Sequence, residues 1–113
     1  MVTADQVRRE ALSLPRTEEH LIHGRLKYRV GRIVYASLSA DETALGFGFP
    51  KEERVGLIAS DPEKFFMPIR SDERFNWVRA WLAALDEQEM RELVLDSWRM
   101  VVPKRVAAAY DAG

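Results

Sequence analysis

The segment that most restricts the fold is residues 25–39, RLKYRVGRIVYASLS. In its first six residues, apolar and basic side chains alternate, which is the period of a strand with one buried face. The Gly-Arg pair that follows has the length of a two-residue hairpin connection, and glycine in its first place favours a type II′ turn. The returning stretch, IVYASLS, is apolar on both faces and predicts an interior strand. The sequence therefore predicts a β-hairpin and an antiparallel sheet.

The segments around this hairpin predict a small mixed fold. Thr3 and Gln6 have the spacing of a capping box before a helix that Pro15 ends, and residues 15–24 are expected to form a loop. Further strands are predicted at 43–49, 64–70 and 75–84, and further helices begin after Pro50, Asp86 and Pro103.

This order of elements is α-β-β-β-α-β-β-α, with a short C-terminal helix. It predicts the α+β class, as a two-layer α/β sandwich in which helices cover one face of an antiparallel sheet of about five strands. Residues 1–113 are expected to form a single domain.

Composition excludes several function classes. The chain has no cysteine, so disulfides, thiolate metal sites and a cysteine nucleophile are ruled out. Its two histidines, His20 and His23, fall in the expected loop, where packing or solvent exposure is favoured over a metal site. No serine or threonine stands in a nucleophile elbow. We therefore expect no enzymatic activity, no cofactor and no metal.

Two further patterns bear on location and on the core. No apolar run is long enough to cross a membrane, and the N-terminus lacks the apolar segment of a signal peptide, so a cytoplasmic protein without a membrane partner is expected. Gly46 and Gly48 do not complete a dinucleotide fingerprint and are expected to admit a neighbouring helix or strand. Trp77, Trp81 and Trp98 are expected mainly to anchor the core.

The formal net charge is −1, but the charges are unevenly placed. The first 35 residues carry seven Arg or Lys against four Asp or Glu, whereas the remainder carries ten against fourteen. The sequence pI of about 6.1 argues against strong general DNA binding, which usually needs a basic domain. It leaves one local basic face, where Arg25, Lys27 and Arg29 project from one side of the hairpin and Arg32 lies at its tip. Such a face suits phosphates, or it is a solvated surface that protects a strand edge.

Several segments together resemble the MmcQ/YjbR family, in particular its short actinobacterial-style members, over about residues 7–111. The markers are ALSLP at 11–15, a glycine at 24, YRVGRIVYASL at 28–38, SDPEKFF at 60–66, WLAALD at 81–86, MRELVLDSWRMV at 90–101 and PKRVAAAYD at 103–111. The resemblance implies a two-layer α/β sandwich with an antiparallel sheet. Members are commonly described as DNA-binding, with hairpins likened to a double wing.

The chain departs from the family pattern at four positions. Relatives often carry an aromatic residue in place of His23, a lysine in place of Gly48 and an arginine in place of Trp81, while Arg79 falls on an apolar position. These departures remove one or two basic positions and weaken the transfer of DNA binding to this chain.

The leading interpretation is a small protein that binds DNA or other nucleic acid weakly and without sequence preference. The expected contacts are Arg25, Lys27, Arg29 and Arg32, joined by Lys104 and Arg105 because a helix opening at Pro103 has free amide donors. One alternative is a protein-interaction module, monomeric or a weak homodimer, with an acidic partner or a paired strand edge. The other is a small-ligand pocket near Gly46 and Gly48, walled by aromatic side chains.

Overall fold

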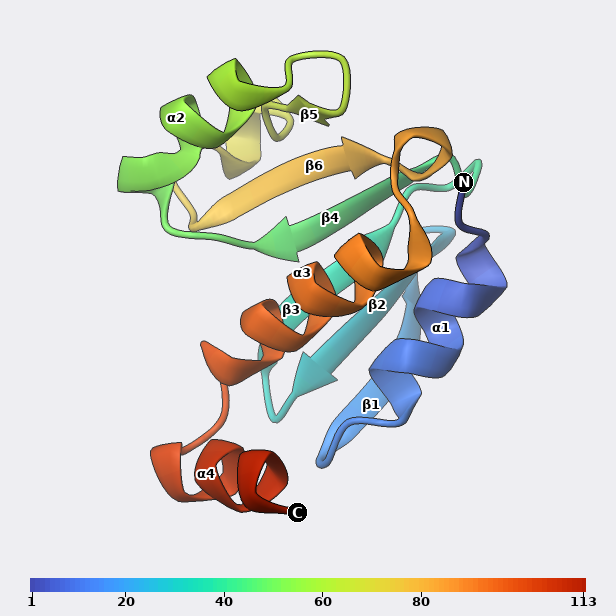
Figure 1. The fold of residues 1–113 in the computed structure, drawn as a ribbon. Coiled ribbons are helices and arrows are strands. Elements are labelled where there is room, and N and C mark those ends of the chain that lie inside the picture. The colour runs from blue at the N-terminus through green and yellow to red at the C-terminus, as the bar shows by residue number, and fades with distance from the viewer.

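The computed structural model describes all 113 residues, and it consists of four α-helices and one six-stranded sheet (Figure 1). In chain order the elements are α1 Ala4–Leu12, β1 Thr17–Ile22, β2 Arg25–Val30, β3 Ile33–Leu38, β4 Ala44–Gly48, α2 Lys51–Ser60, β5 Phe65–Phe66, β6 Trp77–Trp81, α3 Glu87–Arg99 and α4 Lys104–Ala112, with 3-10 turns at Arg70–Asp72 and Leu82–Ala84. The strand order is β1-β2-β3-β4-β6-β5, and every pair is antiparallel. The predicted α+β fold with an antiparallel sheet is confirmed.

The central hairpin forms as its sequence predicts. Val30 of β2 pairs with Ile33 of β3 across a two-residue connection, and Gly31 has a φ of 60°, as the first position of a type II′ turn requires. The register shifts after Tyr28, so Tyr35 is an extra residue of β3 that opposes no partner.

The prediction of a loop at residues 15–24 is wrong, because β1 occupies most of this segment. β1 pairs with β2 along its whole length, and His23 and Gly24 join the two strands with φ values of 52° and 75°. Two consecutive positive φ values are typical of a type I′ hairpin turn. The alternation of apolar and polar residues that marks a strand is not visible in β1, because Glu19, which faces the helices, is charged. Its carboxylate accepts hydrogen bonds from Arg8 of α1 and from the Tyr28 hydroxyl, which allow it to lie under the helix.

Two other strands are shorter than predicted. β5 contains only Phe65 and Phe66, because Pro68 follows and the chain turns away into the 3-10 turn at Arg70–Asp72. β6 ends at Trp81, after which residues 82–84 form the second 3-10 turn.

The core lies between the sheet and its helices. α1 and α3 cover one face of the sheet, as Figure 1 shows, and α2 packs against β5 and β6. The largest fully buried side chains include Trp98, Tyr28, Tyr35 and Phe47. The Trp98 indole N–H donates to the carbonyl of Pro15 at 2.9 Å, which satisfies its polar atom inside the core.

The other two tryptophans do not anchor this core, contrary to expectation. Both belong to β6, where Val78 and Ala80 face the helices, so Trp77 and Trp81 face the opposite side of the sheet. Trp81 is 43% exposed and stacks on Phe66, with ring centroids 4.3 Å apart.

None of the helices combines the length and the apolar character that crossing a bilayer demands.

Candidate functional site

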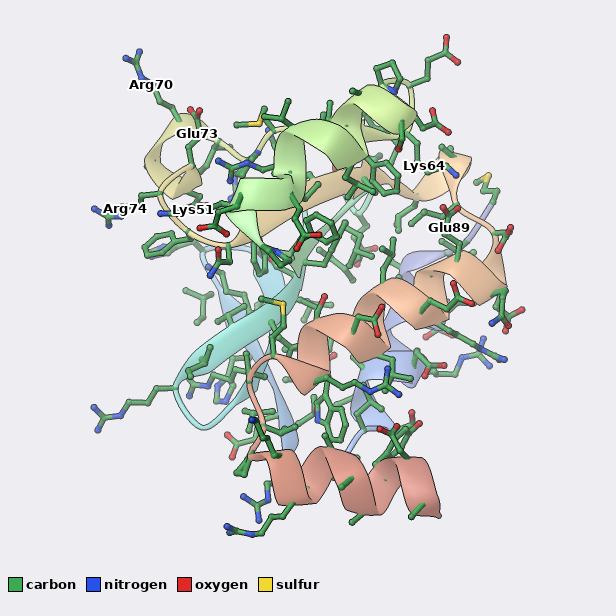
Figure 2. All side chains as sticks on the ribbon, turned by 60° about the vertical axis from the view of Figure 1, so that its left-hand side comes forward. Lys51, Lys64, Arg70, Glu73, Arg74 and Glu89 are labelled. Atoms are coloured by element: carbon green, nitrogen blue, oxygen red, sulfur yellow. The ribbon has the colours of Figure 1, made fainter.

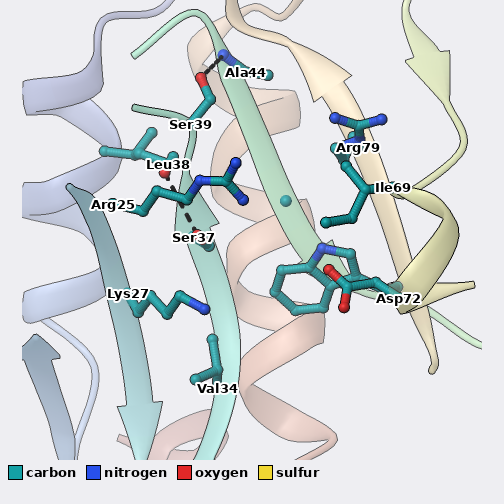
Figure 3. A pocket seen from close by; sticks show the side chains of 12 residues that line it. Arg25, Lys27, Val34, Ser37, Leu38, Ser39, Ala44, Ile69, Asp72 and Arg79 are labelled. Atoms are coloured by element: carbon teal, nitrogen blue, oxygen red, sulfur yellow. Dashed lines mark hydrogen bonds between the residues drawn. The ribbon is translucent and has the colours of Figure 1, made fainter. Parts of the chain in front are cut away.

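The sheet face that α1 and α3 leave uncovered is here called the open face. It carries Arg25, Lys27 and Arg29 from β2, because the alternate residues Leu26, Tyr28 and Val30 pack toward the core. In Figure 3 the labelled side chains of Arg25, Lys27 and Arg79 lie in front of the sheet, with a helix behind it. The basic residues of the hairpin therefore share a face, as the sequence predicted, and β6 adds a fourth cation that the sequence did not predict.

One row of paired residues shapes the centre of this face. Lys27 pairs with Ser37, Ser37 with Gly46, and Gly46 with Arg79. Three strand spacings separate the backbones of Lys27 and Arg79, about 14 Å. The two residues between them are small, so they form a floor that long side chains can overhang from both sides.

A cavity of about 110 Å³ opens above this floor. Arg25, Lys27 and Arg79 line it, and Ile69, just before the 3-10 turn, and Asp72, within that turn, add to its wall (Figure 3). Three cationic side chains and one carboxylate thus border a space too small for a large organic molecule.

Trp77 is held in place at the same spot. A Cβ atom added to Gly46 would lie 2.7 Å from Cζ2 and 2.8 Å from Nε1 of the Trp77 indole, so only glycine leaves room for the ring. The glycine was expected to admit a helix or a strand, and it admits an aromatic side chain instead. Gly48 has no such requirement, since its added Cβ would meet Met100 and Ser97 at ordinary contact distances of 3.6 and 3.7 Å.

Arg79 is anchored while its terminal donors stay free. Its Nε donates to the carbonyl of Met67 at 2.9 Å, and its guanidinium carbon lies 4.5 Å from the centroid of the Phe66 ring. Neither terminal nitrogen has a hydrogen-bond partner in the protein. Burial lowers the pKa of the guanidinium, the positive charge of Arg25 lowers it further, and Asp72 acts in the opposite direction.

The cations of the open face have no acidic partner. The lysine and arginine residues that form ion pairs within 4.0 Å are Arg8, Arg9, Lys64, Arg91 and Arg99. Glu18 of β1 pairs with Arg29 and so lies on the open face, but its carboxylate contacts Nε2 of His20 at 3.0 Å. Arg29 also has a buried Nε without a hydrogen-bond partner, while its Nη2 lies 3.5 Å from Nδ1 of His20. Unpaired cations gathered on one face are an electrostatic arrangement that an anion would stabilise.

A second, larger hollow of about 560 Å³ adjoins the first, where β4 turns away from β3 after Gly48. Its apolar wall consists of Ile33, Val34, Tyr35, Phe75, Trp77, Met100 and Val101. Arg32 also lines it from the exposed tip of the hairpin, so this predicted contact lies beside the open face.

Lys104 and Arg105 line neither of these hollows. They open α4, which packs on the end of α3 through the Tyr110 ring, 5.2 Å from that of Trp98. Arg105 lines a separate hollow with Pro15 and Arg16, and this hollow shares no residue with the two described above. The sequence predicts these two side chains in the same interface, and they line neither of its two hollows.

The histidines form no cluster. His20 lies on β1 and its Nε2 is 3.0 Å from the carboxylate of Glu18, whereas His23 occupies the hairpin turn. Nowhere do three or more His, Asp or Glu side chains come together as a metal ion would need.

The loop that walls the site is braced from α2. Arg54, only 8% exposed, donates to the carbonyls of Glu73, Phe75 and Trp77 at 2.9 to 3.2 Å. Lys51 adds a hydrogen bond to the Arg74 carbonyl at 3.2 Å, and Figure 2 shows these two residues side by side while Arg70 projects away from the molecule. Beyond the other end of α2, Lys64 contacts both carboxylate oxygens of Glu89 on α3 (Figure 2).

Comparison with known families settles what kind of domain this is. The model of the YjbR family matches residues 12–100, which include the basic hairpin, the loop that walls the site and all of α3. The chain belongs to the YjbR family. No curated protein matches it. Among solved structures, it resembles the crystal structure of Deinococcus radiodurans protein DR2400, described as a DUF419 domain, with a TM-score of 0.79 and 22% identity over 93% of this chain and 82% of that one. At this identity the likeness shows a shared fold alone. The match to the family model confirms the family resemblance noted from the sequence.

Proposed function

We propose that this YjbR-family protein binds nucleic acid weakly and without sequence preference, through the basic side chains of the open face. One observation carries the proposal: Arg25, Lys27, Arg29 and Arg79 share this face and none has an acidic partner within 4.0 Å. Phosphates would supply the missing negative charges, and binding would release their condensed counterions. No catalytic step is part of the proposal.

The same face favours single strands over duplex. Phe75 is 50% exposed, and Trp77 is partly exposed beside it in the wall of the larger hollow. Unpaired bases stack on such rings at roughly 1–3 kcal/mol each without regard to sequence. In a duplex the bases are stacked inside the double helix, so they cannot stack on these rings.

Two matched double variants test the proposal. R25Q/K27Q removes one arginine and one lysine from the open face, and K104Q/R105Q removes the same pair of charges from the start of α4. We expect the parent to bind a single-stranded oligonucleotide with a dissociation constant of about 10⁻⁴ to 10⁻⁶ M at physiological salt, the usual non-specific range. Every phosphate that is no longer neutralised lowers the log–log salt slope by about 0.7 for a single strand.

R25Q/K27Q should therefore lower the slope by about 1.4, while K104Q/R105Q should leave it unchanged. Fluorescence anisotropy over a salt series measures both. Equal slopes for the two variants, or binding by R25Q/K27Q as tight as that of the parent at low salt, would show that the open face is merely a solvated surface.

A further inference from the structure

The two hollows of the open face adjoin each other. Lys27, Val34, Asp72 and Trp77 line both of them, so a ligand that reaches across these four residues would contact both. One compartment is small and bordered by cations, and the other is about five times larger and mostly apolar.

The small cavity has the charge and the size for one phosphate group. Its 110 Å³ holds no more than a few water-sized groups. Arg25 and Lys27 line it from β2, and Arg79, whose terminal nitrogens have no hydrogen-bond partner, lines it from β6. A phosphate monoester carries about −1.5 to −2 at pH 7, whereas an internal phosphodiester carries −1. Three cations therefore favour the monoester.

The larger hollow suits a planar ring. Phe75 and Trp77 offer aromatic surface, and Met100 and Val101 from the end of α3 complete an apolar wall. Asn76 stands in the same wall, and its Oδ1 accepts the backbone N–H of Lys51 at 3.0 Å. That bond fixes the amide so that its NH₂ group remains available to a ligand.

We infer that the two hollows form one binding site for a nucleoside 5′-phosphate, with the phosphate between Arg25, Lys27 and Arg79 and the nucleoside against Phe75 and Trp77. The inference rests on the proposed function, since it names the part of a nucleic acid that this face holds most tightly. A free mononucleotide and the 5′-phosphorylated end of a single strand present the same chemistry.

Asp72 provides a test in which a substitution should make ligand binding tighter. Its carboxylate lines both compartments and is the only acidic side chain in either, and it forms no ion pair within 4.0 Å. It opposes a bound phosphate through space. D72N should therefore tighten binding of a phosphorylated ligand by a few fold, and should leave binding of the unphosphorylated ligand unchanged.

The experiment compares four probes by calorimetry: adenosine 5′-monophosphate, adenosine, and an eight-nucleotide DNA with either a 5′-phosphate or a 5′-hydroxyl. We expect the monophosphate to bind while adenosine does not, and the 5′-phosphate to tighten oligonucleotide binding about tenfold at equal salt. R79Q should abolish this preference. R25Q should reduce it without risk to the fold, because Arg25 is exposed and makes no hydrogen bond. R70Q is the control, since Arg70 is exposed and lines neither hollow.

The outcomes separate the two claims. If both oligonucleotides bind equally and the monophosphate does not bind, the pocket is refuted while the proposed function stands. If none of the four probes binds, both fail. If the monophosphate binds and neither oligonucleotide does, the pocket serves a free nucleotide and the proposed function is refuted.

Discussion

Replacing Arg54 by methionine tests whether one buried guanidinium holds the wall of the candidate site. Its Nη1 donates to the carbonyls of Phe75 and Trp77 at 3.2 and 3.1 Å, and its Nη2 donates to that of Glu73 at 2.9 Å. A hydrogen bond from a charged donor contributes about 1.5–3 kcal/mol, so three at the lower value sum to about 4.5 kcal/mol. Carbonyls near the loop surface regain water when the guanidinium is removed, which reduces the cost. We expect R54M to lower the free energy of unfolding by about 2–4 kcal/mol.

Urea unfolding at pH 7 measures this loss, and hydrogen exchange shows where it acts. The amides of Asp72 and Phe75, which bond within the loop, should exchange faster in R54M than in the parent. R54K keeps the charge but cannot reach three carbonyls at once, so it should recover only part of the stability.

The matched control is R74M, an exposed arginine of the same loop whose side chain only lies over the Phe75 ring. Its effect should stay within about 0.5 kcal/mol. If R54M is as mild as R74M, or costs less than about 1 kcal/mol, the carbonyl cluster does not hold the loop and the reasoning is wrong.

Two further predictions concern the core. Trp98→Ala should lower the free energy of unfolding by about 3–5 kcal/mol, because Trp98 is fully buried. Trp77→Ala should lower it by only about 1–2 kcal/mol, because that ring is partly buried. Denaturant unfolding measures both losses, and a larger loss for Trp77→Ala than for Trp98→Ala would contradict the prediction. The hydrogen bond from Arg8 holds the pKa of Glu19 below its usual range, aided by the Tyr28 hydroxyl and opposed by burial. The resulting stabilisation is present above the unfolded pKa of about 4.3 and is lost as pH falls below it, so the parent should lose more stability than E19Q between pH 6 and pH 3, and equal losses would contradict this.

Local signals predicted the elements whose partners are close in sequence. Thr3 and Gln6 form both hydrogen bonds of the predicted capping box, and Asp86 accepts the amide of Glu89 at the start of α3. The β2–β3 hairpin follows from alternation and from a two-residue turn, both of which are complete within the segment. Such features depend on short-range geometry and need no knowledge of the rest of the fold.

β1 was missed for the opposite reason. A strand is recognised by apolar residues on its inner face, and Glu19 breaks that pattern because its partners, Arg8 and Tyr28, lie on other elements. The same limit applies to the tryptophans. Trp77 and Trp81 follow the strand period onto one face of β6, but that period alone does not tell which face the helices cover.

The candidate site was half predictable. Arg25 and Lys27 share a face through the strand period alone, whereas Arg79 joins them only because β6 pairs with β4, so that the row from Lys27 crosses Ser37 and Gly46 to reach it. The signal that would have found Arg79 is its place between two aromatic residues on a strand, the pattern of a polar group on an apolar face.

The distribution of charge supports the proposal that this face binds an anion. The chain has 18 acidic residues, enough to pair every one of its 17 Lys and Arg residues, and it does pair five of them, from Arg8 on α1 to Arg99 on α3. On the open face it places three cations around one cavity, leaves only the small residues Ser37 and Gly46 between them, and lines that cavity with a single carboxylate, Asp72. Like charges held together cost stability, and natural sequences keep such local conflicts chiefly where a ligand resolves them. An exposed outer face needs basic residues to remain soluble, but it needs neither the small floor nor the indole fixed across it.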